Sequence, residues 1–213
     1  MSLIDLINKK TILPSPSEAL PGRKEKIEVP NQHFIKGVTL TEPFPTNMKR
    51  AMFGMGCFWG VEKIFWEMNG VFSTIVGYSG GITLNPTYNE VCTGRTGHNE
   101  VVLIIFDPKL INFKDLLISF WEGHNPTQGM RQGNDNGTQY RSGIYCFDDL
   151  QKTLANETKQ NYQAKLTESG LGEITTEIEV AKEFYYAEHN HQQYLAKNPD
   201  GYCGIDGTGI LFK

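Results

Sequence analysis

Apolar residues recur along this chain at the spacings of strands and helices. The continuous apolar run Val101–Phe106 is typical of a central strand in a sheet. Val61, Ile64, Phe65 and Met68 follow the i, i+3, i+4, i+7 spacing of a helix with one buried face. The same patterns predict further strands over 49–53, 71–78, 140–147 and 174–180, and further helices over 113–121, 149–167 and 186–197.

The order of the predicted elements indicates the fold class. A strand, helix and strand over residues 49–78 are followed by a second strand, helix and strand over 101–147, with more elements appended. This order is typical of an α+β fold, a two-layer α/β sandwich of the split βαβ (ferredoxin-like) type. Two glycine-rich polar loops, 79–97 and 125–137, separate the elements, and the first is long enough to carry function.

Both ends of the chain lack a clear period and predict extended coil. The first 45 residues contain six prolines, so we interpret 1–45 as an N-terminal extension packed on a single domain, 46–213. The last segment, 198–213, contains four glycines around Cys203. We expect this tail to be mobile, which would let its thiol approach and leave a rigidly held partner. A tail cysteine that pairs with nothing is the alternative.

Composition and charge narrow the classes of function. With 39% hydrophobic and 21% charged residues the chain has the composition of a soluble protein, and its net charge of −4 disfavours nucleic acid or an anionic membrane as a partner. No apolar run approaches the roughly 18 residues that span a bilayer. Asp5 and Asn8 interrupt the apolar core that a secretory signal would need. We therefore expect a cytoplasmic protein, and in the absence of an exposed heptad or edge motif, a monomer.

The four cysteines are too widely spaced for a metal site of the C-x-x-C kind. They are Cys57, Cys92, Cys146 and Cys203. They are also too few for the disulfide framework of a small secreted domain. We therefore expect no metal and no cofactor, and thiols that are either structural or catalytic.

One cysteine, Cys57, stands where the first strand is predicted to end and its helix to begin. Unpaired N–H groups and the helix dipole stabilise a thiolate at such a position, which predicts a lowered pKa. Phe58 and Trp59 follow directly and would form an apolar wall beside the thiol. The alternative is that Cys57 is a small core residue.

Five stretches of the chain, spread over 52–209, carry a resemblance to one family. They are Gly56–Gly60, Gly77–Gly81 continued by Asn85–Tyr88, Gly97–Glu100, Gln132–Ser142, and His191–Leu195 continued by Asn198–Gly204. In their content and order they resemble peptide methionine sulfoxide reductases of the A type.

The resemblance implies a thiol-dependent reduction of the S epimer of methionine sulfoxide, in oxidised proteins and peptides or free, to methionine. Glu100 would protonate the sulfoxide oxygen, which is a poor leaving group, and burial beside the apolar strand would keep this acid protonated. Tyr88 and Tyr140 would donate hydrogen bonds to the same oxygen. Asp135 would orient its neighbours and the substrate. A solvated Glu100 and ordinary half-buried tyrosines are the alternatives that the residues alone leave open.

The resemblance also implies how the enzyme would be recycled. Reaction would leave a sulfenic acid on Cys57, which Cys203 would convert to a disulfide, and thioredoxin would reduce that disulfide. Phe58 and Trp59 would hold the methyl group of the substrate. The position eight residues after Cys203 is Leu211, so we expect a cycle of two cysteines. Cys92 and Cys146 fall in strand-like segments and are interpreted as structural.

Two other classes of function remain as alternatives. In a cysteine hydrolase, Cys57 would act with a histidine base, for which His98 is the obvious candidate. In a binding module without catalysis, Phe58 and Trp59 would recognise methionine-bearing peptides.

Overall fold

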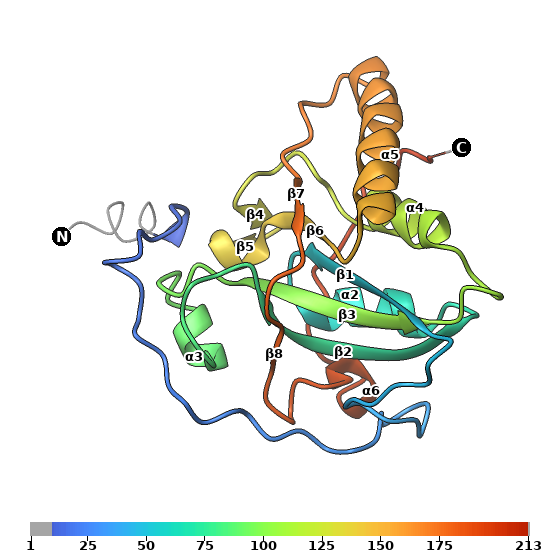
Figure 1. The fold of residues 1–213 in the computed structure, drawn as a ribbon. Coiled ribbons are helices and arrows are strands. Elements are labelled where there is room, and N and C mark those ends of the chain that lie inside the picture. Colours follow the sequence, from blue (N-terminus) through green and yellow to red (C-terminus); the bar gives the residue numbers. More distant parts are fainter. Residues whose placement is uncertain (1–9, 213) are drawn as a thin grey trace.

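The structure, a computed structural model, describes residues 10–212 (Figure 1). The longer elements are β1 (Lys49–Met55), α2 (Phe58–Trp66), β2 (Val71–Ser79), β3 (Asn99–Phe106), α4 (Phe113–Gly123), β6 (Ser142–Cys146) and α5 (Asp149–Glu168). The shorter ones are α3 (Tyr88–Val91), β4 (Arg131–Gln132), β5 (Asp135–Asn136), η1 (Thr138–Tyr140), β7 (Glu177–Val180), β8 (Tyr185–Tyr186) and α6 (Tyr194–Lys197).

The main sheet has six strands in the order β7-β6-β1-β3-β2-β8. Only β6 and β7 pair in parallel, and the other neighbouring strands are antiparallel. The predicted α+β class is therefore confirmed, with a mixed sheet. The pairing of Tyr78 with Glu100 places the end of β2 beside the start of β3. Gly54 and Met55, at the end of β1, pair with the start of β6.

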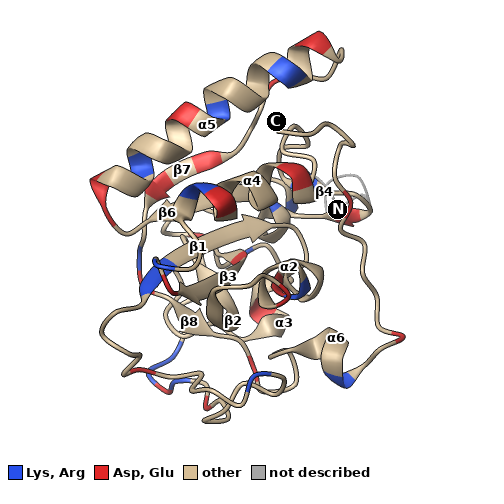
Figure 2. Ribbon diagram, turned by 90° about the vertical axis from the view of Figure 1, so that its right-hand side faces the viewer, with Lys and Arg blue, Asp and Glu red and all other residues tan. Residues whose placement is uncertain are grey.

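Side chains of the sheet alternate between two apolar cores. On one side, Phe53 packs against Phe65 of α2 and against Phe113 and Phe120 of α4. Its neighbour Met52 belongs to the second core, on the opposite side. Figure 2 shows α4 and α5 on one side of the sheet, with acidic and basic residues mixed along α5. In the described part of the chain, no helix is long and apolar enough to cross a membrane.

The second core is covered by the N-terminal extension, which runs along the outside of the molecule from residue 10 (Figure 1). Leu40 is fully buried there with Ile75 and Leu103. His33 reaches the sheet through a 3.0 Å hydrogen bond between its Nε2 and Thr74 Oγ1. The predicted absence of a secretory signal concerns a segment of which residues 1–9 lie outside the described residues.

The helix predicted over 186–197 is wrong in most of its length. Tyr186 belongs to β8, and only Tyr194–Lys197 is helical. The side chain of Gln192 instead bonds the backbone of β2, accepting from the N–H of Val76 at 3.1 Å and donating to its carbonyl at 2.9 Å. Gln193 adopts a left-handed conformation, with φ of 49°. These contacts to a distant strand outweigh the local helical pattern.

Other boundaries differ from the prediction in smaller ways. The first strand continues to Met55, the strand predicted over 140–147 is 142–146, and the one over 174–180 begins at Glu177. The loop 79–97 contains the short helix α3, which the pattern did not predict. A capping box stabilises the start of this helix, because the side chains of Thr87 and Glu90 each accept a hydrogen bond from the other residue's backbone N–H group.

Candidate active site

Cys57 lies at the junction predicted for it, immediately before the first residue of α2. β1 ends at Met55, and Gly56 makes the turn with a φ of 98°, which favours glycine. A side chain at Gly56 would also meet Gln132, since an added Cβ would lie 2.7 Å from that residue's Cβ. Both the positive φ and the close approach of Gln132 therefore require glycine at this turn. The turn places the half-buried Cys57 thiol at the start of the helix.

The predicted lowering of the Cys57 pKa is wrong for the free site. Burial raises the pKa of this thiol well above its ordinary value, the nearby Glu100 raises it further, and a hydrogen bond from the backbone N–H of Trp59 opposes the shift. At the helix start the N–H of Phe58 bonds Glu100 and that of Trp59 bonds Cys57, but burial of the thiol outweighs the second of these hydrogen bonds. In the free site, therefore, the thiol holds its proton.

Glu100 lies at the start of β3 and is buried, with 1% of its surface exposed. Its Oε2 accepts the hydrogen bond from Phe58 N at 3.0 Å. Its Oε1 is buried and has no hydrogen-bond partner among residues 10–212. Burial raises the pKa of Glu100 to about 8, against the hydrogen bond from Phe58 and with a small contribution from Asp135. The expected burial of this carboxyl group is confirmed, and it is protonated at neutral pH.

The two candidate tyrosines reach the same site from different elements. Tyr88 begins α3, and Tyr140 ends η1. The pKa of each phenol is raised, first by burial and then by the charge of Glu100, and Cys57 contributes to both shifts. Both hydroxyls therefore remain protonated and can donate hydrogen bonds.

Phe58 and Trp59 differ in how deeply they are buried. Phe58 is fully buried, and its ring packs against Tyr78, Tyr88 and His191. Trp59 is half-buried and stacks on Tyr194 with ring centroids 4.0 Å apart. Its indole N–H donates to His191 Nδ1 at 3.1 Å.

His191 and Tyr194 therefore form an aromatic wall together with Phe58 and Trp59. Sequence reasoning did not name these two as site residues. His191 also packs against Tyr88, with ring centroids 4.3 Å apart. The signal that could have identified them was the stretch His191–Leu195, since it resembles the family but lies far from Cys57 in sequence.

The C-terminal tail carries Cys203 and also contacts Asp135 of β5. Tyr202 donates from its hydroxyl to Asp135 Oδ2 at 3.4 Å, and burial raises the pKa of Asp135. Cys203 is exposed and lies against α2, since a Cβ added at Gly60 would be 3.0 Å from its Sγ. Cys57 and Cys203 are free thiols in the structure, and the charge of Cys203 contributes to the raised pKa of Cys57.

The tail is coil, as expected, but its last part is anchored. Phe212 N donates to Glu122 Oε1 at 2.6 Å, and the Tyr162 hydroxyl donates to the carbonyl of Ile210 at 2.9 Å. Ile205 also packs against the core. The predicted mobility of the residues around Cys203 stays a prediction.

Cys92 lies closer to the site than the sequence indicated. It is not in a strand but follows α3 as its C-terminal cap. Burial raises its pKa, Glu100 raises it further, and the adjacent hydroxyl of Tyr88 opposes the shift. Cys146, in contrast, is buried in β6, where a strand was expected.

His98 is not available as a base for Cys57. Its Nδ1 accepts from Gly81 N at 3.1 Å, and its Nε2 lies 2.7 Å from the carbonyl oxygen of Thr83. Burial lowers its pKa to about 4. With both ring nitrogens bonded to loop backbone, this histidine holds the loop, which argues against the cysteine hydrolase. In residues 10–212 no group of three or more His, Cys, Asp or Glu side chains is arranged to hold a metal ion.

Comparison with known proteins identifies the family of this chain. The sequence profile described as peptide methionine sulfoxide reductase matches residues 49–210. Peptide methionine sulfoxide reductase MsrA 1 of Synechocystis sp. is 60% identical over 210 residues, which are 99% of this chain and 95% of the relative. The MsrA of Saccharophagus degradans is 59% identical over 211 residues, 99% of this chain and 98% of its own.

Solved structures show the same fold. Methionine sulfoxide reductase A of Corynebacterium diphtheriae has a TM-score of 0.85 and 46% identity, over 90% of this chain and 93% of its own. Reduced Mxr1 of Saccharomyces cerevisiae has a TM-score of 0.71 and 35% identity, over 76% and 92%. Mxr1 in complex with Trx2 shares the fold at a TM-score of 0.53 and 22% identity, over 78% and 94%. The chain therefore belongs to the MsrA family of peptide methionine sulfoxide reductases.

Proposed function

We propose that this protein reduces the S epimer of methionine sulfoxide, in oxidised proteins and peptides or free, with Cys57 as the nucleophile and Glu100 as the acid. One observation carries the assignment of roles. The Glu100 carboxyl group, from β3, is buried beside the start of α2, is protonated at neutral pH, and keeps one oxygen without a partner among the described residues. A protonated carboxyl group with an unpartnered oxygen, next to a thiol, can donate its proton to an oxygen atom of the substrate.

The reaction transfers one oxygen atom and two electrons. Cys57 sulfur attacks the electrophilic sulfoxide sulfur while Glu100 gives its proton to the oxygen. The thiol proton returns to the Glu100 carboxylate, so the acid is regenerated. The S–O bond of the substrate breaks, methionine leaves, and Cys57 holds the hydroxyl as a sulfenic acid. The substrate sulfur is reduced and the Cys57 sulfur is oxidised.

The remaining side chains bind and orient the substrate. The phenols of Tyr88 and Tyr140 donate to the sulfoxide oxygen without carrying charge, which stabilises the negative charge that develops there. Trp59 and Phe58 hold the methyl group, with Trp59 at the surface and Phe58 beneath it. Asp135 orients this arrangement from β5.

Cys203 completes the cycle. Its thiol attacks the sulfenic acid of Cys57, forms a disulfide and releases water. Thioredoxin then reduces this disulfide by thiol–disulfide exchange and is itself oxidised. The position of Cys203 against the first turns of α2 supports this step, as does the solved complex of the relative Mxr1 with Trx2.

We also propose a single catalytic domain, residues 46–213, with the N-terminal extension 1–45, of which the structure describes residues 10–45, packed on it. Its core is a split βαβ unit, which is supported by the antiparallel order β6-β1-β3-β2 and by the placement of α2 and α4 between successive strands of that unit. One chain supplies Cys57, Glu100 and Cys203, so a monomer can act alone. The free thiols suit the reducing cytoplasm.

Separated S and R epimers of methionine sulfoxide test the proposal directly. With dithiothreitol as reductant, we expect methionine from the S epimer alone and none from the Cys57→Ser variant. No methionine from either epimer, with a folded protein and a free Cys57 thiol, would refute the activity. Normal binding of the sulfoxide by the same Cys57→Ser variant would then favour a binding module.

A further inference from the structure

We propose that Arg23, in the N-terminal extension, is a positioning residue that holds Tyr88 in the active site. This inference rests on the proposed function, because it concerns the phenol that donates to the sulfoxide oxygen. It gives the extension a part in catalysis, although the extension precedes the segment 49–210 that matches the family profile.

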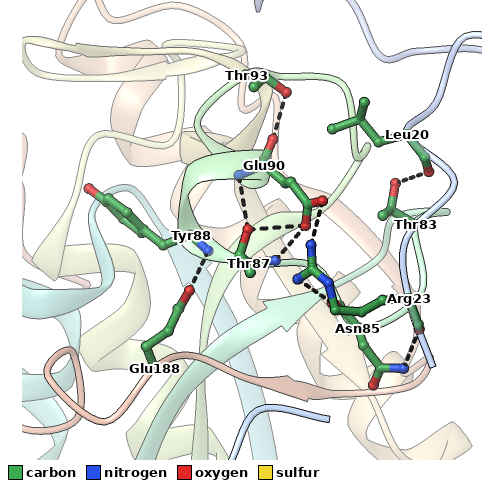
Figure 3. A network of polar contacts seen from close by, with 9 residues as sticks. All are labelled: Leu20, Arg23, Thr83, Asn85, Thr87, Tyr88, Glu90, Thr93 and Glu188. Carbon is green, nitrogen blue, oxygen red and sulfur yellow. Dashed lines mark hydrogen bonds and ion pairs between the residues drawn. The ribbon is translucent and has the colours of Figure 1, made fainter. Parts of the chain in front are cut away.

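Arg23 ties the extension to the segment that carries Tyr88 (Figure 3). Its guanidinium pairs with Glu90 Oε1 at 2.6 Å and donates to the carbonyl of Asn85 at 3.3 Å. The amide of Asn85 donates back to the carbonyl of Arg23 at 2.8 Å. Close by, Thr83 Oγ1 donates to the carbonyl of Leu20 at 2.8 Å. Contacts in both directions therefore fix this loop against the extension.

The contacts converge on a helix that is too short to be stable alone. α3 has four residues, whereas isolated helices shorter than about 12 residues are marginal in water. Glu90 connects the helix start with the extension. Its Oε2 accepts from the backbone N–H of Thr87 at 2.8 Å, and its Oε1 binds Arg23. Loss of Arg23 would thus release one end of the carboxylate that caps α3.

Tyr88 is the residue of α3 whose ring packs against Phe58, Trp59 and His191 of the site. Its backbone N–H is held on the other side by Glu188 Oε1 at 2.8 Å. Figure 3 shows its hydroxyl directed away from Arg23 and the other extension contacts. Arg23 therefore acts on the tyrosine through the backbone of α3, not by contact with the substrate. Hydrogen bonds to developing charge depend on such fixed geometry.

A double-mutant cycle measures this coupling. In single turnovers of the reduced enzyme with the S sulfoxide, we expect Arg23→Ala to slow methionine formation by about 3- to 10-fold. In a Tyr88→Phe background the same change should have no further effect, because the hydroxyl that it positions is absent. In a Tyr140→Phe background it should keep its full factor, since that hydroxyl comes from η1. Equal factors in both backgrounds, or no slowing in the single variant, would overturn the proposal.

Arg50→Ala is the matched control. Arg50 also pairs with the extension, at 2.8 Å from Glu42 Oε1, but it lies at the end of β1 remote from Cys57. We expect wild-type rates for it. Amide exchange of residues 87–92 gives a second test that needs no activity, and Arg23→Ala should accelerate it while Arg50→Ala should not. If the wild type forms no methionine, the proposed function fails, and unchanged exchange would overturn the positioning role.

Discussion

The backbone N–H of Phe58 donates a 3.0 Å hydrogen bond to Oε2 of Glu100. This bond joins the first N–H group of α2 to the acid, while the next, that of Trp59, bonds the Cys57 thiol. It also leaves the other carboxyl oxygen, Oε1, unpartnered among the described residues and available to a ligand. The bond holds the buried carboxyl group beside Cys57, whose thiol is kept protonated in the free site by its own burial and by Glu100.

Replacing Glu100 by Gln should remove the proton donor and keep the shape of the site. We expect single-turnover methionine formation to slow by about 10²- to 10⁴-fold. Because the acid must be protonated, the wild-type rate should fall as the pH rises through about 8, the pKa of Glu100. A pH profile of both proteins checks this, and the variant should lack that decline. A variant with the wild-type decline would show that another group causes it.

Replacing Cys203 by Ser should separate the first reaction from recycling. We expect about one methionine per enzyme and a sulfenic acid on Cys57, because no thiol is left to form the disulfide. The measurement is methionine released per mole of enzyme, with thioredoxin as the sole reductant. Cys146→Ser is the control, since Cys146 is buried in β6, and it should turn over normally. Many turnovers by Cys203→Ser would refute the resolving role.

Much of the fold could be predicted because its signals are local. The apolar run of β3, the helical stripe of α2 and the turn between β1 and α2 depend on residues close in sequence. The burial of Glu100 was also predictable, because it directly precedes that apolar run. The lack of a partner for its Oε1 within residues 10–212 was not predictable, since this depends on how the surrounding loops fold.

The errors arise where distant segments decide the structure. Gln192 bonds the backbone of β2, so the local helical pattern over 186–197 is overridden. His191 joins the aromatic wall for the same reason, since its place depends on contacts with α2. The Cys57 pKa was wrong in direction because burial and Glu100 outweigh the helix terminus. No periodicity in a single sequence contains this information.

Stability should depend on pH through a second buried acid, Glu62, which lies in α2. Burial raises its pKa from 4.5 to about 8, although Gln193 and Thr74 donate hydrogen bonds to it. The folded state therefore binds this proton more tightly than the unfolded chain does. Its stabilising contribution is full below pH 4.5 and is lost as the pH rises through about 8.

Urea unfolding at several pH values between about 5 and 8 tests this expectation. The free energy of unfolding should decline with pH less steeply in Glu62→Gln than in the wild type. The variant should also be less stable at low pH by about 1–3 kcal/mol, because an amide N–H group opposes the backbone N–H of Gln193. An unchanged slope would mean that Glu62 has the same pKa folded and unfolded.

Replacing Gly60 by Ala should disturb the cycle at the disulfide step. The added Cβ would lie 2.6 Å from Ile205 Cγ2 and 3.0 Å from Cys203 Sγ, so the tail must shift away from α2. Alanine favours a helix by about 1 kcal/mol over glycine, so a weakened α2 is not the cause we expect. Methionine formation in the first turnover should stay near the wild-type rate, while disulfide formation slows on the order of tenfold.

Mass spectrometry of quenched single turnovers separates these two steps, since the sulfenic acid and the disulfide differ in mass. Gly172→Ala is the control, because an added Cβ there meets nothing within 4 Å and the backbone is not left-handed. It should resemble the wild type in both steps. If Gly60→Ala forms its disulfide at the wild-type rate, the contact between the tail and α2 does not set the approach of Cys203. Accumulated sulfenic acid would instead show that this contact guides the resolving thiol to Cys57.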